Sequence, residues 1–187
     1  NAIGKEGVCY IVEGYTDVIS MHQNGIENVV SASGTALTLE QIKLINRLAN
    51  NVVLLFDGDN AGIKATYKSI NMILKEGMNV KIAAFPKGED PDSFSKKLST
   101  DDFKEFLTTE AVDFIDYKIK ISDLNTIEDP TKITNIKRDI IESISCIPDS
   151  LNRSQYCKTF SKKLDIAENI LLNEVAKARA NIGSFEQ

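Results

Sequence analysis

The sequence predicts an α/β fold in which helices flank a parallel sheet, followed by a C-terminal all-α helical bundle. Short apolar runs rich in β-branched residues recur in the first half of the chain, bounded by Gly, Asp or Asn. Such runs are typical of buried strands in a parallel sheet. After Phe94 no strand-like run appears, and the apolar residues take helical spacing. We therefore predict two domains, residues 1–97 and 98–187.

Strand and helix patterns alternate along the first half. The expected strands are residues 8–12, 28–32, 52–56 and 80–85, and the expected helices between them are residues 16–24, 38–48 and 61–76. Gly25 and Gly77 end two of these helices. Thr38 and Gln41 have the spacing of a capping box, in which a hydroxyl and an amide satisfy free backbone N–H groups. This order of elements predicts right-handed parallel crossovers.

Helical signals continue through the second half. Asp129 is a candidate N-cap, because a proline follows it at the first helical position. The apolar residues beyond it recur at steps of three and four, which predicts a helix with one buried face. That stripe consists of Ile133, Ile136, Ile140 and Ile144. Pro148 ends this helix and precedes the next.

Composition excludes several classes of protein. A net charge of −5 over 187 residues argues against a domain that holds nucleic acid by bulk electrostatics alone. The three cysteines are widely spaced, so neither zinc nor a disulfide framework is expected, and a reducing cytoplasm suits them. No apolar run approaches the length of a membrane span, and no signal peptide is visible. We expect a cytoplasmic protein without membrane contact. Because the chain opens almost directly into a strand, we also expect a fragment of a longer protein.

Acidic residues follow three of the expected strands. They are Glu13, Asp57, Asp59, Asp90 and Asp92. In open α/β sheets, ligands bind outside the carboxyl ends of the strands. Carboxylates gathered at that edge repel one another unless a cation joins them, and hard oxygen ligands suit Mg²⁺ or Mn²⁺. The pattern therefore indicates a metal site for phosphate chemistry.

Each of these acidic segments also has a simpler interpretation. Asp57-Gly58-Asp59 is typical turn chemistry, although the helix expected after it would present free N–H groups beside the acids. Asp17 lies in the first turn of a helix, where the helix dipole favours an acid. The loop around Asp90 is by itself more typical of a solvated turn.

Basic residues give a weaker signal. Lys64 and Lys68 lie one turn apart on the helix after the Asp57 motif, and form either a solvated face or a phosphate-facing edge. The single histidine, His22, is expected to be a surface or packing residue.

Four motifs closely resemble the TOPRIM segment of bacterial DnaG-type replicative primases, in order and in spacing. They are YIVEGYTDV at residues 10–18, ASGTALT at 32–38, LFDGDNAGIKA at 55–65 and GEDPD at 88–92. The helical second half is similar to the bundle that completes the polymerase domain of that family. TOPRIM folds also occur in topoisomerases, RecR-like repair proteins and nucleases, but these motifs together resemble a primase.

The resemblance implies synthesis of short RNA primers on single-stranded DNA, by a nucleotidyltransferase that uses Mg²⁺, with Mn²⁺ as a substitute. The implied partners are the template, ribonucleoside triphosphates, the RNA primer, and a replicative helicase bound through a domain absent from this chain. By position, the catalytic metal ligands are Glu13, Asp57 and Asp59, with Asp90 and Asp92 as a further metal-binding pair. Residues implied to support these ligands or to bind phosphate are Gly14, Asp17, Gly58, Gly62 and Lys64.

Two parts of a complete primase have no counterpart in the sequence. They are the zinc-ribbon cysteines and the basic subdomain expected before the TOPRIM segment. We therefore expect the isolated fragment to be inactive. Two other hypotheses stay open: TOPRIM-type strand cleavage, as in nucleases and topoisomerases, and a non-catalytic module whose helical half binds a replication protein.

Overall fold

The chain forms two compact units. The structure, a computed structural model, describes residues 2–32, 37–56, 60–86 and 88–185, and the side chains of residues 56, 60–65 and 183–185 fall outside that description. The first unit comprises residues 1–73 and 78–114, and the second comprises residues 74–77 and 115–187. Residues 98–114 thus belong to the first compact unit, whereas the sequence pattern changes character at residue 97. As a subdomain boundary, that position stays a prediction.

The first unit is built on one five-stranded sheet. Its strands are β1 (Val8–Val12), β2 (Val29–Ser31), β3 (Asn51–Phe56), β4 (Asn79–Ala84) and β5 (Val112–Asp113). Their spatial order is β2-β1-β3-β4-β5, and all neighbouring pairs are parallel except β4 with β5. The four predicted strands and their parallel arrangement are confirmed.

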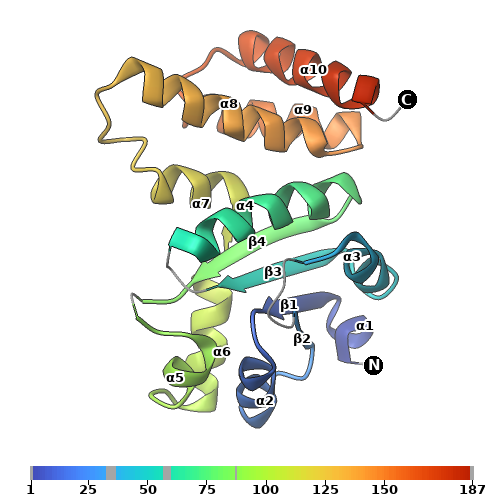
Figure 1. The fold of residues 1–187 in the computed structure, drawn as a ribbon, viewed down its shortest axis with the longest axis vertical. Helices are drawn as coiled ribbons and strands as arrows, with labels where there is room; N and C mark the ends of the chain where they lie inside the picture. The colour runs from blue at the N-terminus through green and yellow to red at the C-terminus, as the bar shows by residue number, and fades with distance from the viewer. Residues whose placement is uncertain (1, 33–36, 57–59, 87, 186–187) are drawn as a thin grey trace. The chain divides into compact units, whose positions relative to one another are not determined.

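Helices cover both faces of this sheet. In the first unit they are α1 (Ala2–Glu6), α2 (Tyr15–Gln23), α3 (Leu39–Asn46), α4 (Asn60–Lys75), α5 (Pro91–Ser95) and α6 (Thr100–Thr109). Figure 1 shows α4 on one face, and α2, α5 and α6 on the other. Because β3 is the middle strand and is covered on both sides, its sequence is a continuous apolar run rather than an alternating one.

The core on the α2 face joins the sheet to two helices. Val53 and Leu55 of β3 are buried in one cluster with Met21 of α2 and with Phe103 and Leu107 of α6. Side chains alternate along a strand, so Val52 and Leu54 face the other layer, and both are buried there. Burial of this kind contributes about 1.5–3 kcal/mol for each large apolar side chain.

Helix ends follow the signals in the sequence. The hydroxyl of Thr38 accepts a hydrogen bond from the backbone N–H of Gln41 at 3.3 Å, and the Gln41 amide oxygen accepts one from the N–H of Thr38 at 2.9 Å. The predicted capping box therefore exists. Gly25 and Gly77, beyond the ends of α2 and α4, have φ values of 68° and 76°. These left-handed values favour glycine and explain why both helices stop there.

Three short elements, α1, α5 and β5, were missed by the sequence analysis. The expectation of no strand after Phe94 is wrong, because β5 pairs antiparallel with β4, with Val112 opposite Ile82. A two-residue strand has no periodicity of its own, and only the unpaired edge of β4 makes it one. The chain also begins with α1 before β1, instead of opening into the strand.

The second unit is helical, as predicted. Its helices are α7 (Phe114–Ile121), α8 (Pro130–Cys146), α9 (Ser150–Phe160) and α10 (Glu168–Phe185), of which Phe114 itself falls in the first unit. Asp129 caps α8 by accepting from the backbone N–H of Thr131 at 2.8 Å. Ile140 and Ile144, from the predicted stripe, are fully buried, and Ile133 and Ile136 are half-buried. In the described part of the chain, no helix combines the length and apolarity needed to span a bilayer.

Candidate metal centre

The topology of the sheet brings three strand ends together. β1, β3 and β4 are adjacent and parallel, so their carboxyl ends share one edge. Glu13 directly follows β1, and the loop that leads to Asp90 follows β4. Asp57, Gly58 and Asp59, which come next after β3 in the sequence, lie outside the described residues. The central pair of predicted ligands therefore stays a prediction.

The helix after the central strand begins where the sequence predicts it. α4 starts at Asn60, immediately after the Asp57 motif, and contains Gly62 and Lys64. The side chain of Lys64 lies outside the described part of the chain. A helix N-terminus at this position offers free backbone N–H groups and a positive dipole end to an anion.

Asp17 joins two of the predicted segments. Its carboxylate accepts the N–H of Gly14 at 3.0 Å and also the backbone N–H of Asp92. The residue is buried at 8% exposure. Burial raises the pKa of Asp17, and the charges of Asp90 and Asp92 raise it further. The two backbone hydrogen bonds act in the opposite direction and lower it, but the net shift is upward. Asp17 is thus more than a helix-terminal charge, because it holds the Glu13-Gly14 turn beside the Asp90 loop.

Gly14 leaves little room for a side chain at this turn. A Cβ atom there would lie 3.3 Å from Oδ2 of Asp17 and 3.4 Å from Oγ1 of Thr16. The close approach lets the Gly14 N–H reach the carboxylate. Glu13, just before it, is half-buried at the end of β1.

Asp90 caps α5. One of its carboxylate oxygens accepts the N–H of Ser93 at 2.6 Å, and the Ser93 hydroxyl accepts the N–H of Asp90 at 3.1 Å. The same hydroxyl donates to Glu89 at 2.7 Å. The solvated-turn interpretation is therefore incomplete, since this loop is the start of a helix.

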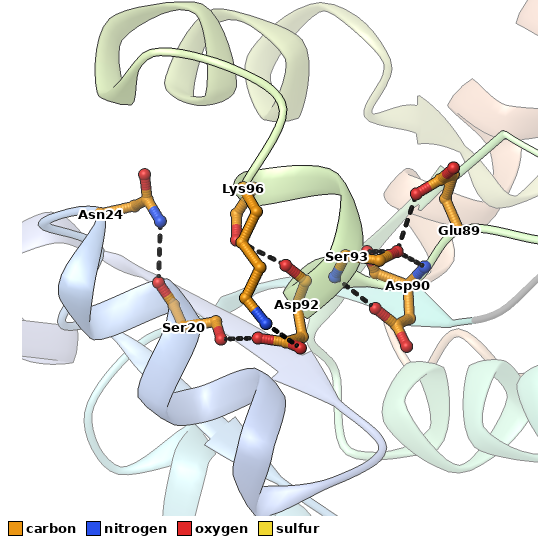
Figure 2. A network of polar contacts seen from close by, with 8 residues as sticks. Ser20, Asn24, Glu89, Asp90, Asp92, Ser93 and Lys96 are labelled. Carbon is orange, nitrogen blue, oxygen red and sulfur yellow. Dashed lines mark hydrogen bonds and ion pairs between the residues drawn. The ribbon is translucent and has the colours of Figure 1, made fainter.

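Asp92 belongs to α5, and its carboxylate contacts α2, as Figure 2 shows. Its Oδ2 accepts from Nζ of Lys96 at 2.7 Å, and its Oδ1 accepts from the hydroxyl of Ser20. These two hydrogen bonds, that from Lys96 first, lower the pKa of Asp92. Sequence analysis assigned no functional role to Ser20 or Lys96. The spacing of four between Asp92 and Lys96 could have indicated their pairing, but Ser20 lies 72 positions away and gave no signal.

Aromatic packing fixes the position of α5. Phe94 lies with its ring centroid 4.7 Å from that of Phe106 in α6 and 5.7 Å from that of Phe85, just after β4. α5 is a single turn, too short to be stable alone. Packing on α6 therefore sets where Asp90 and Asp92 lie.

Carboxylates suit a hard divalent cation at this edge. Burial is the main cause of the raised pKa of Asp17, and the nearby carboxylates of Asp90 and Asp92 add to it. Within the described ranges, no three His, Cys, Asp or Glu side chains are placed to hold a metal ion, and Asp57 and Asp59 are outside those ranges. The donor chemistry fits Mg²⁺, while the convergence of all five acids stays a prediction.

A separate hollow in the first unit lies among other residues. It has a volume of about 590 Å³ and is lined by residues that include Lys5, Tyr10, Asn28 and Lys104. None of the predicted site residues lines it. His22 is exposed on the surface of α2, as the sequence analysis expected.

Comparisons of sequence and of structure with known proteins find similar relatives. A Toprim-like family model matches residues 10–95. The DNA primase of Clostridium acetobutylicum is 38% identical over 177 residues, which cover 92% of this chain and 29% of that protein. The zinc-binding and RNA polymerase domains of the Aquifex aeolicus primase superpose with a TM-score of 0.76 at 30% identity, over 91% of this chain and 40% of that one. A DnaG primase catalytic domain bound to single-stranded DNA superposes with a TM-score of 0.70 at 25% identity. The match covers 85% of this chain and 51% of that one.

The first unit is therefore similar to Toprim-like domains, because residues 10–95 match their family model and lie on a mostly parallel sheet. Over most of its length the chain is homologous to the DnaG-type DNA primases. It spans about 29% of the length of the curated primases that it matches.

Proposed function

We propose that this chain carries the metal site of a DNA primase, whose full-length parent synthesises short RNA primers by metal-dependent nucleotidyl transfer. One observation carries the proposal: β1, β3 and β4 are adjacent and parallel, and Glu13, Asp57 and Asp90 follow their carboxyl ends in the sequence. Homology to DNA primases supports the same reaction.

Five carboxylates would hold the metal. Glu13, Asp57 and Asp59 are the proposed central ligands of Mg²⁺, and Asp90 and Asp92 would share it. Divalent cations at such a site neutralise charge on the triphosphate and lower the pKa of the primer 3′-hydroxyl. Glu13 would either bridge the metal or relay a proton from that hydroxyl.

The motif residues around these acids would support binding. Gly14 and Asp17 hold the turn after β1, and Gly58 would let a ligand approach the main chain. Gly62 and Lys64 lie in the first turns of α4, where backbone N–H groups and a basic side chain suit a phosphate.

Partners follow from the same proposal. The template would be single-stranded DNA, which a homologous DnaG catalytic domain binds. Ribonucleoside triphosphates would be the substrates and an RNA primer the product. A replicative helicase would bind elsewhere in the parent protein, which we place in the cytoplasm.

A primer-synthesis assay tests this function. In the full-length parent, Asp57→Asn should reduce nucleotide incorporation on single-stranded DNA by about 100-fold or more, because a charge that stabilises the transition state is lost. The matched control is Asp101→Asn, which changes an exposed acid at the start of α6 in the same unit.

Metal binding gives a second readout. Mn²⁺ should bind the wild type more tightly than the double variant Asp57→Asn, Asp59→Asn. Equal affinity would remove the metal role from this pair. Strand cutting without nucleotide incorporation by the parent would instead favour the nuclease alternative.

The docking hypothesis has less support. It requires exposed apolar stripes on the helices after Asp129. Ile140 and Ile144 are buried within the second unit, and Leu171 and Val175 of α10 are buried as well. These four side chains therefore pack in the core of their own unit, whereas Leu151 of α9 and Ile170 of α10 are exposed single residues.

A further inference from the structure

Two donors from different helices hold the carboxylate of Asp92. The hydroxyl of Ser20, on α2, donates to Oδ1, and Nζ of Lys96, on α5, donates to Oδ2 (Figure 2). Ser20 comes from a segment 72 positions earlier in the chain. The contact therefore depends on the tertiary fold and not on helix spacing.

The two donors differ in rigidity. Ser20 is 5% exposed on the inner side of α2, and its backbone carbonyl accepts from Nδ2 of Asn24 at 2.9 Å. The side chain of Lys96 is 67% exposed and extends from the surface. An exposed ion pair of this kind contributes only about 0.2–1 kcal/mol. Ser20 is thus the donor that fixes the orientation of the Asp92 carboxylate.

A bond from Ser20 leaves Asp92 able to bind a cation. Each carboxylate oxygen has two lone pairs, so Oδ1 can accept from a hydroxyl and still coordinate a metal. Lys96 is a cation itself and competes with a metal for the same charge. A neutral hydroxyl does not compete in this way.

We propose that Ser20 is a positioning residue that orients Asp92 toward a divalent cation at the carboxyl edge of the sheet. This inference rests on the proposed metal site. Hydrogen bonds to the outer side of a metal ligand typically change metal affinity by about 10–100-fold when they are removed. Ser20 supplies such a bond to a ligand that lies on a one-turn helix.

Mn²⁺ titration of four proteins tests the proposal: wild type, Ser20→Ala, Ser20→Thr and Ser95→Ala. Ser20→Ala should weaken Mn²⁺ binding about 10-fold, and Ser20→Thr should restore it because the hydroxyl remains. Ser95→Ala is the matched control. Ser95 is a buried serine of α5 whose hydroxyl donates to the backbone carbonyl of Asp92 at 3.1 Å, not to the carboxylate.

Melting temperatures in the presence of EDTA separate positioning from general loosening. A positioning role predicts that Ser20→Ala and Ser95→Ala lose similar stability while only Ser20→Ala loses Mn²⁺ affinity. The inference is overturned by wild-type affinity in Ser20→Ala, by an equal loss in Ser95→Ala, or by failure of Ser20→Thr to restore binding. Absence of Mn²⁺ binding by the wild type would overturn the proposed metal site together with this inference, so the two failures are distinguishable.

Discussion

At the scale of single residues, Lys118 shows how the helical unit accommodates a buried charge. Lys118, on α7, is fully buried, and its Nζ donates to Asp139 at 2.6 Å and to Ser143 at 2.7 Å, both on α8. Burial lowers the pKa of Lys118, and the charge of Asp139 opposes that decrease. The ammonium group is therefore stable inside the unit only because its partners are in place.

Removing Asp139 should destabilise the helical unit more than removing Lys118. We expect Asp139→Ala to lower the free energy of unfolding by about 2 kcal/mol, because it removes the carboxylate that accepts from the buried Lys118 ammonium at 2.6 Å. Lys118→Met should cost much less, since it removes the buried charge itself. Urea denaturation of both variants measures the difference. A larger loss in Lys118→Met than in Asp139→Ala would show that the ion pair itself stabilises the unit.

At the scale of elements, Asp17 contributes to the contact of α2 with α5. Its carboxylate accepts from the N–H of Gly14 near the start of α2 and from the N–H of Asp92 in α5. Burial raises the pKa of Asp17, and the neighbouring charges of Asp90 and Asp92 raise it further. The two backbone N–H groups need an oxygen acceptor at Asp17. In the absence of metal, burial and the nearby carboxylates nevertheless disfavour a negative charge on that side chain.

Substitutions at Asp17 can separate these two effects. Asp17→Asn keeps an oxygen acceptor and removes the repulsion, so we expect its melting temperature in EDTA to equal or exceed that of the wild type. Asp17→Ala leaves two backbone N–H groups without their acceptor and should cost about 2 kcal/mol. Thermal denaturation of both variants checks this. Equal destabilisation by Asn and Ala would mean that the negative charge itself is needed.

At the scale of the whole molecule, the core of the first unit extends past residue 97. Phe103 and Leu107 of α6 are buried against β3 and Met21, and Phe106 packs on Phe85 with centroids 5.4 Å apart. A chain that ends at residue 97 would lose these side chains and expose the part of the sheet that α6 covers. β5 would be lost as well.

Two truncations test where the first domain ends. We expect residues 1–114 to fold cooperatively, because they retain α6 and β5, and residues 1–97 to lack a cooperative transition. Far-UV circular dichroism during thermal denaturation distinguishes the two fragments. A cooperative transition in residues 1–97 would favour the boundary that the sequence pattern suggested.

Much of the fold could be predicted because its signals are local. The four parallel strands follow apolar runs in the sequence, and Thr38, Gly25 and Gly77 mark helix ends through local chemistry. β5 and α5 could not be predicted in this way. Val112 is a strand residue only because Ile82 of β4 lies opposite it, and α5 exists where Asp90 caps it and Phe94 packs on α6.

The sequence by itself determined the parallel sheet, the helical second half and the acids that follow three strands. Runs of apolar residues and capping chemistry act over a few positions, so they can be read directly. Only the tertiary structure decided that Asp17 contacts the Asp92 backbone and that Ser20 holds the Asp92 carboxylate. Those contacts join segments more than 70 positions apart, and their existence depends on how α2 and α5 pack on the same sheet.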